Sequence, residues 1–292
     1  MKIILSRKGF DSSAGGYPSP HLVDSGRLIS FPIPEDEDVD TGVSYSDLRV
    51  DKNHTYLDLM EQLGIRKYSN GSSVHLDPDI NALVTQRKHS EWRGIFGQSS
   101  AAQAHLSKKK VKEGDLFLFF GWFKDAIRTA TGYRYVNGTH RHIIWGYMQI
   151  GDIERINKVG QYDNWKLTHP HYKFRDRDMN TAFIASTSLT FDSSIPGCGT
   201  FNYDESLVLT QDGQRNRSLW NLPSFFHPSM GTTMSYHKNL YTKKGKPVWQ
   251  LRDDHCTLQS VGRGQEFVIE GNDEIEKWAK KLIQRQYSLK QK

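Results

Sequence analysis

Asp115-Leu-Phe-Leu-Phe-Phe-Gly-Trp-Phe123 is the first of two apolar stretches that decide the fold of this chain, and His142-Ile-Ile-Trp-Gly-Tyr-Met-Gln-Ile150 is the second. Both are rich in aromatic and β-branched residues and too short to span a membrane. The polar connection between them contains Gly132, Asn137 and Gly138, which interrupt regular structure. The pattern predicts two strands in the middle of a sheet. Their connection is either a solvated turn or the rim of a site.

Outside this hairpin the chain offers further strands and a few helices. Residues 3–6, 183–189 and 206–210 have strand composition. Apolar spacing predicts a helix from Thr55 to Leu63, with Thr55 and Asp58 as its cap, and a second helix over about 273–287. Regular helical crossovers between strands are missing, and no repeat or linker divides the chain. We therefore predict one α+β domain over residues 1–292, with a mixed, mostly antiparallel sheet core and peripheral helices.

The composition is that of a soluble globular protein. Of the 292 residues, 36% are hydrophobic and 25% are charged, which excludes a disordered chain. The formal charge of +6 favours a polyanionic partner, because basic side chains gain affinity by releasing counterions from phosphates. The excess charge is spread along the chain, so charge alone leaves nucleic acid binding open.

Cysteine usage and the amino terminus bear on the compartment. The two cysteines, Cys198 and Cys256, are far apart and form no CxxC motif, which disfavours a disulfide framework or a thiolate zinc site. The segment from Met1 to Lys8 has only three consecutive apolar residues, too few for a signal-peptide core. These observations predict a cytoplasmic protein that does not enter a membrane.

His75-Leu-Asp-Pro-Asp79 is the first candidate site. In an extended segment the side chains of His75, Asp77 and Asp79 share one face, because strand side chains alternate. An imidazole with two carboxylates can bind a divalent metal or act as acid and base. The alternative is that Asp77-Pro78-Asp79 is ordinary turn chemistry.

Two pairs of histidines have the same spacing of two residues. They are His140 with His142, next to the second apolar stretch, and His169 with His171. Imidazoles two apart in an extended segment share a face and can bind zinc, iron or copper. Neither pair has the helical context of a known metal motif, so a hydrogen-bonding or surface role stays open for each.

Several polar groups are candidates for contacts with a nucleotide. Arg7 and Lys8 begin a loop rich in Gly, Ser and Pro, where backbone amides can approach a phosphate. Arg215 lies near Trp220, a combination suited to holding a phosphate and stacking a base. The acidic run of residues 35–38 is expected to be solvated. The predicted nucleotide contacts are Ser6, Arg7, Lys8, Asp11, Arg93, Gln98, Arg215, Trp220 and Gln265.

Seven segments together resemble a known family, the nucleotide modification associated domain 3 family. They are residues 4–11, 96–106, 114–123, 145–147, 169–171, 220–223 and 264–268. The resemblance spans nearly the whole chain and rests on the order and spacing of these segments. It implies association with DNA base modification in bacteria and their phages, and it implies that the motif residues form one pocket. It brings no established reaction, so the roles below come from the residues themselves.

The leading hypothesis is an enzyme, a transferase or a hydrolase, that modifies a nucleotide or a DNA base at a site built from several loops. Its predicted catalytic residues are Asp77, Asp79, His142, His169 and His171. A divalent metal is the candidate cofactor, with His75, Asp77, His169 and His171 as candidate ligands.

Two other readings of the sequence remain. The first is a non-catalytic reader of modified bases with a barrel-like module, in which Trp122, Trp145 and Trp220 stack on a flipped base. The second is a scaffold that binds other DNA-modification enzymes and has no site of its own.

Overall fold

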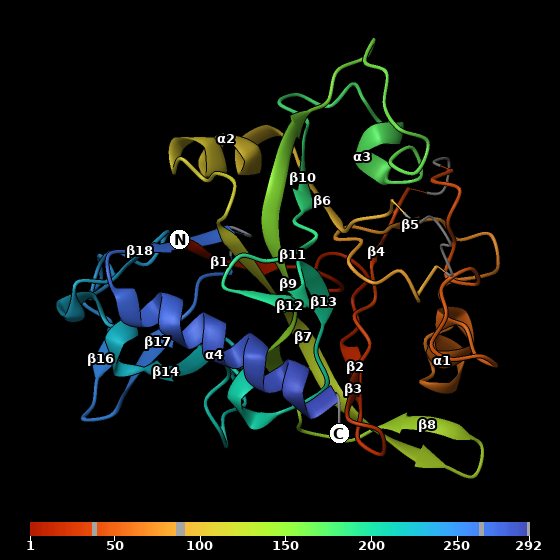
Figure 1. Ribbon diagram of the computed structural model, residues 1–292. Helices are drawn as coiled ribbons and strands as arrows, with labels where there is room; N and C mark the ends of the chain where they lie inside the picture. The colour runs from red at the N-terminus through yellow and green to blue at the C-terminus, as the bar shows by residue number, and fades with distance from the viewer. Residues whose placement is uncertain (37–39, 86–90, 263–265, 291–292) are drawn as a thin grey trace.

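The two longest strands of the sheet form its central hairpin (Figure 1). The computed structural model describes residues 1–36, 40–85, 91–262 and 266–290. Strand β7 (Leu116–Thr129) pairs antiparallel with β9 (Arg141–Arg155), with Leu116 opposite Gln149. The prediction of two central strands is confirmed. The polar connection is more ordered than expected, because β8 (Gly132–Tyr135) folds back on the end of β7.

The other strands extend this hairpin into an open mixed sheet of eleven described strands. Its main path runs β15 (Thr233–Met234), β18 (Glu266–Glu270), β1 (Ile3–Arg7), β7, β9, β10 (Thr181–Ala185) and β6 (Ile95–Gln98). Strands β2 (Ser19–Leu22), β3 (Arg27–Leu28), β8 and β13 (Cys198–Thr200) join this path from the side. Only β1 and β2 run parallel to β7, and the other described pairings in this sheet are antiparallel. The α+β class with a mostly antiparallel sheet is therefore confirmed, whereas the extent of the domain stays a prediction.

Three smaller sheets and several short 3-10 turns accompany the main sheet. One sheet pairs β4 (Ile33–Pro34) with β5 (Val74–His75), and another pairs β11 (Ser188–Leu189) with β12 (Asp192–Pro196). The third contains β14 (Leu219–Pro223), β17 (His255–Gln259) and β16 (Trp249–Leu251). The 3-10 turns are η1 (Glu205–Leu207), η2 (Ser224–Phe226) and η3 (Pro228–Met230).

The predicted strand over residues 206–210 is wrong in its first half. The Asp204 carboxylate accepts a hydrogen bond from the Ser206 amide at 3.0 Å, and this cap starts the turn η1. Val208 and Thr210 then form only isolated bridges. A local side-chain cap overrides the strand composition here.

The helices lie at the periphery, as expected. Helix α1 (Tyr56–Gln62) has the predicted capping box of Thr55 and Asp58. Helix α4 (Asp273–Lys290) begins after Asn272, whose side chain accepts a hydrogen bond from the Glu274 amide at 2.9 Å. It packs Ile275, Ala279, Leu282 and Ile283 against the core and crosses the sheet in Figure 1. The other two helices are α2 (Ser100–Lys108) and α3 (Pro170–Lys173).

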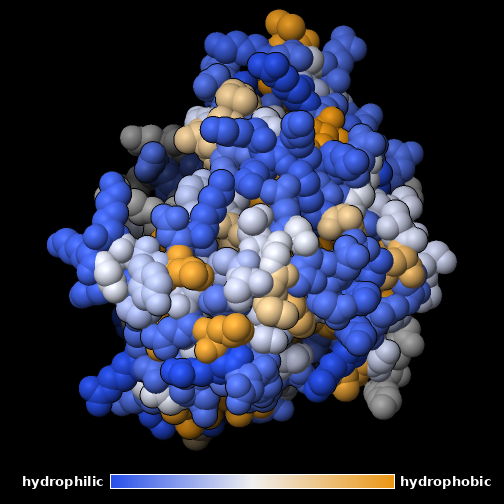
Figure 2. Space-filling view, turned by 90° about the vertical axis from the view of Figure 1, so that its left-hand side faces the viewer, coloured by the Kyte–Doolittle hydropathy of each residue, from blue (hydrophilic) through white to orange (hydrophobic). Residues whose placement is uncertain are grey.

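Aromatic side chains fill the core on both faces of the sheet. Phe96, Phe117, Phe119 and Phe183 are in mutual contact on one face, and Phe120, Trp220 and Phe267 are in contact on the other. Each such ring contributes about 1.5–3 kcal/mol by leaving water. The molecular face drawn in Figure 2 is mostly hydrophilic, with apolar residues in small separate groups. Among the described residues, no helix is long and apolar enough to cross a membrane.

Candidate metal centre

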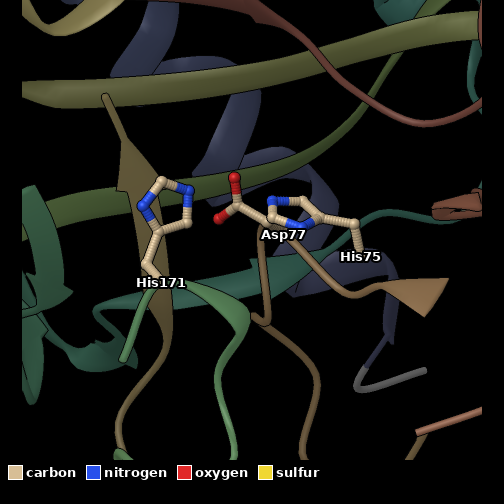
Figure 3. A group of neighbouring side chains, drawn as sticks. All are labelled: His75, Asp77 and His171. Atoms are coloured by element: carbon tan, nitrogen blue, oxygen red, sulfur yellow. The ribbon is translucent and has the colours of Figure 1, made fainter. Parts of the chain in front are cut away.

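Three side chains from two distant segments converge beside β6. His75 ends β5, Asp77 follows it by two residues, and His171 lies in α3. One ligand atom from each lies within 4.8 Å of the others, and Figure 3 shows the two rings flanking the carboxylate. His75 is 7% exposed and His171 is 3% exposed. Two imidazoles and one carboxylate are a donor set that Zn²⁺ and Fe²⁺ accept, with positions left for water or substrate.

Each imidazole is fixed through its Nδ1 atom. The Asn180 side chain donates Nδ2–H to the His171 carbonyl at 2.9 Å, so its Oδ1 faces His171 Nδ1, 2.6 Å away, and accepts a hydrogen bond from it. His75 Nδ1 is hydrogen-bonded to the Glu35 carboxylate. A neutral imidazole that donates from Nδ1 has a free lone pair on Nε2. Both rings therefore have the outer partner and tautomer typical of metal-ligating histidines.

The Asp77 carboxylate is held by groups on its other side. Its Oδ1 accepts a hydrogen bond from the Gly97 amide at 2.7 Å. His169 Nε2 lies 3.3 Å from the same oxygen, without the alignment of a hydrogen bond. His169 Nδ1 accepts the His171 amide at the start of α3, so a neutral His169 carries its proton on Nε2, beside Asp77.

These contacts set the protonation states that a metal needs. Burial alone raises the pKa of Asp77, but the neighbouring His169 and His171 and the Lys8 ammonium outweigh it and hold that pKa well below its usual value. Burial lowers the pKa of His171 to about 3. At neutral pH the group therefore contains an ionised carboxylate and a neutral imidazole.

Gly97 allows β6 to approach α3 closely. A methyl group added to this glycine would overlap the ring of His171. We expect Gly97→Ala to lower metal affinity about 10–100-fold by displacing that ring, and to destabilise the fold by about 1–3 kcal/mol through overpacking. Isothermal titration with Zn²⁺ and chemical unfolding measure the two effects.

The matched control for this substitution is Gly71→Ala. Gly71 has no atom within 4 Å of the added methyl group, so both quantities should stay at their wild-type values. A Gly97→Ala protein that binds Zn²⁺ as the wild type does would contradict the proposed role of His171.

A second buried polar group lies next to the metal candidate. The Lys8 ammonium is 3.3 Å from Glu266 Oε1 and 4.4 Å from the centroid of the Phe96 ring. Glu266 also accepts hydrogen bonds from Gln98 Nε2 at 2.5 Å and from Ser6 Oγ at 3.4 Å. Burial raises the pKa of Glu266, and Lys8 opposes this shift. Lys8 is thus a buried cation that acts on both Glu266 and Asp77.

His142 and Trp220, both predicted as site residues, lie on the face of the sheet opposite Lys8 and Glu266. Trp220 is fully buried and donates Nε1–H to His142 Nδ1 at 3.0 Å. Both contact Phe120, and Arg7 also stacks on that ring. Arg7 faces this side because it alternates with Ser6 and Lys8 along β1.

The remaining predicted residues do not join the metal group. Asp79 pairs through its backbone with Ile95, since β5 ends at His75 and the chain bends at Pro78. Asp11 caps its own loop by accepting the amides of Ser13 and Ala14. Arg93 is paired with Asp152, Arg215 is exposed, and Gln265 lies outside the described residues.

Glu35 and Asn180 are the partners that sequence reasoning missed. Glu35 belongs to the acidic run that we expected to be solvated, but its side chain accepts a hydrogen bond from His75. Burial raises the pKa of Glu35, but this bond and the charges of His75, Arg177 and His171 together outweigh burial and lower that pKa. Asn180 is 1% exposed and shows no distinctive spacing in the sequence. Gly97 carried one signal, its place between two strand residues, which is typical of a close backbone approach.

An α+β fold whose open sheet has a buried, oriented His-Asp-His group at one edge defines a candidate metalloprotein. Residues 2–270 match the family described as nucleotide modification associated domain 3, and the chain belongs to this family. The resemblance found in the sequence is confirmed, and membership associates the chain with nucleotide modification. Comparison with curated proteins and with solved structures finds no match.

Proposed function

We propose that the protein is a metal-dependent enzyme that modifies a nucleotide or a DNA base. The observation that supports this most is the group of His75, Asp77 and His171, whose imidazoles have their second nitrogens bound by Glu35 and Asn180. Such outer partners orient metal ligands and are not needed by solvated surface histidines. Membership of a nucleotide modification family supports the substrate class.

In this proposal each nearby side chain has a separate task. His75, Asp77 and His171 would hold the metal, which supplies Lewis-acid chemistry when bound. A neutral His169 presents its Nε2 proton 3.3 Å from the Asp77 carboxylate, so it would position Asp77 by electrostatic attraction. Lys8 places a positive charge beside the centre, where it can neutralise an anionic group of the substrate.

Two tryptophans of the reader hypothesis are not available for stacking. Trp145 is 6% exposed and Trp220 is fully buried, so both belong to the core. The open sheet also differs from a barrel-like module. These observations support an enzyme over a reader. A bacterial or phage origin, cytoplasmic location and other DNA-modification enzymes as partners remain predictions from the sequence.

The decisive experiment compares base modification by the wild type and by Asp77→Asn. DNA from cells that express the protein with the other enzymes of its modification system is digested to nucleosides and analysed by mass spectrometry. We expect a modified nucleoside with the wild type. With Asp77→Asn we expect a loss of about 100-fold or more, since the carboxylate charge on the metal is removed.

His169→Ala tests the orienting role and should reduce modification about 10–100-fold. Asp254→Asn, an exposed carboxylate far from the centre in sequence, is the control and should have no effect. Unchanged modification in both Asp77→Asn and His169→Ala would refute the enzyme. Binding of modified DNA without any chemical change would instead establish the reader.

A further inference from the structure

We propose that a second site, on the face of the sheet to which Arg7 points, binds a phosphate group. It consists of Arg217, His140 and His142, with Trp122 and Trp220 as positioning residues, and we call it the Trp–His cluster. Its assignment to the substrate rests on the proposed function, whereas phosphate binding itself does not.

Two indole N–H groups fix the tautomers of the two histidines. Trp122 Nε1 donates to His140 Nδ1 at 2.9 Å, and Trp220 Nε1 donates to His142 Nδ1 at 3.0 Å. An indole can only donate, so each Nδ1 must be an acceptor. The proton of each neutral imidazole is therefore on Nε2. Neither Nε2 has a hydrogen-bond partner in the part of the chain that the structure describes; His140 is partly exposed, and His142 is 4% exposed.

Both histidines are held in the neutral form. The pKa of His142 is lowered well below its usual value by burial and then by Arg7 and Arg217. Burial, Lys124 and Arg217 lower the pKa of His140 in the same way. Two Nε2–H donors that stay neutral can face an anion without needing a carboxylate partner of their own.

Arg217 is anchored next to these donors. Its guanidinium lies 4.2 Å from the centroid of the Trp122 ring and donates to Ser12 Oγ at 2.6 Å. The Thr210 hydroxyl accepts the His142 amide at 2.8 Å and donates to the Arg217 carbonyl at 2.7 Å. This link ties the Arg217 loop to β9. Trp122 lies directly opposite His142 in the strand pairing, so the whole cluster is on one face.

The positive charge at this place is not balanced by ion pairs. Within the described residues, neither Arg217 nor Arg7 forms an ion pair with a carboxylate. Burial lowers the pKa of Arg7, and the positive charge of Arg217 lowers it further. Asp11 acts electrostatically on both guanidiniums, and its carboxylate already accepts hydrogen bonds from the amides of Ser13 and Ala14.

A guanidinium fork next to two N–H donors is suited to phosphate oxygens. Phosphate can come from a free nucleotide or from a polynucleotide backbone. The second source has a structural argument in its favour. Arg7 contacts Phe120 beside the Trp–His cluster, and the next residue, Lys8, is close enough to act on Asp77 of the metal candidate, so the end of β1 adjoins both sites. A chain of nucleotides can reach both around this end.

The test measures binding of a labelled twelve-nucleotide single-stranded DNA by fluorescence anisotropy. EDTA is present, so that a failure of the metal proposal does not affect the result. We expect Arg217→Gln to weaken binding about 10–100-fold, the range for a lost charge-assisted hydrogen bond, and to reduce the salt dependence by about one phosphate contact. Arg252→Gln is the matched control, because it removes the same charge from an exposed residue outside every proposed site, and it should change affinity less than twofold.

Inorganic phosphate and a nucleoside monophosphate serve as competitors and distinguish the sources. Similar affinities for phosphate, the nucleoside monophosphate and the oligonucleotide indicate that the site takes a free phosphate group. A much higher affinity for the oligonucleotide indicates that it takes the polynucleotide backbone. Addition of phosphate should also shift the Nε2–H resonances of His140 and His142 in ¹⁵N NMR spectra. Equal loss in Arg217→Gln and Arg252→Gln, or no binding of phosphate or oligonucleotide by the wild type, would overturn the proposal.

Discussion

His171→Ala is expected to abolish stoichiometric metal binding. The wild-type chain should bind one Zn²⁺ or Fe²⁺ through His75, Asp77 and His171, and mass spectrometry of the purified protein measures the metal content directly. Removal of one of three ligands should cost more than the 10–100-fold that the loss of an outer partner costs. His75→Ala should behave in the same way.

The control for this prediction is His227→Ala. His227 is also a buried histidine, but its Nδ1 is bonded to Ser229 and it is not part of the metal group. Its replacement should leave the metal content at the wild-type value. Bound metal also stabilises the fold, by about 2.7 kcal/mol at 100 times Kd, so thermal unfolding with added Zn²⁺ gives a second readout. A His171→Ala protein with full metal content would exclude this centre.

Glu266→Ala is expected to have the largest effect on stability. The substitution leaves the Lys8 ammonium buried without its partner and removes the acceptor of Gln98. Breaking one side of a buried ion pair typically costs about 3–5 kcal/mol. Urea unfolding monitored by tryptophan fluorescence measures this loss of free energy.

Two comparisons make the stability prediction specific. Glu270→Gln, at the end of the same strand, removes a carboxylate that pairs with Lys2 and Lys109 near the surface, and it should cost less than about 1 kcal/mol. The double variant Lys8→Met with Glu266→Leu removes both charges and should recover most of the lost stability. If Glu266→Ala lost as little free energy of unfolding as Glu270→Gln, the buried Lys8 ammonium would not be stabilised by its pair with Glu266.

Features that depend on neighbouring residues could be predicted from the sequence. The strands around Leu116 and Ile144 follow from their local composition, and the cap of α1 follows from Thr55 and Asp58, three residues apart. The same holds for one half of the metal group, since His75 and Asp77 are two residues apart. Local patterns also misled where a turn replaced a strand, as at Ser206.

The rest of the site depends on tertiary contacts. His171 was a candidate, but its convergence with His75 requires α3 to pack on β6, which the small size of Gly97 permits. Glu35 and Asn180 have roles only because their hydrogen bonds to these rings are formed in the fold. His142 contacts Phe120 and Trp220 and not His171, and sequence spacing does not reveal which segments pack against a strand residue.

Strand β1 controls both faces at once through the alternation of Arg7 and Lys8. A shift of its register by one residue would exchange the guanidinium and the ammonium between the two sides of the sheet. The parallel pairing of Arg7 with Phe120 and the antiparallel pairing of Ser6 with Glu266 fix this register from both neighbours. An insertion or deletion in this strand would therefore disrupt both faces together, whereas a point substitution can change the charge on either face separately.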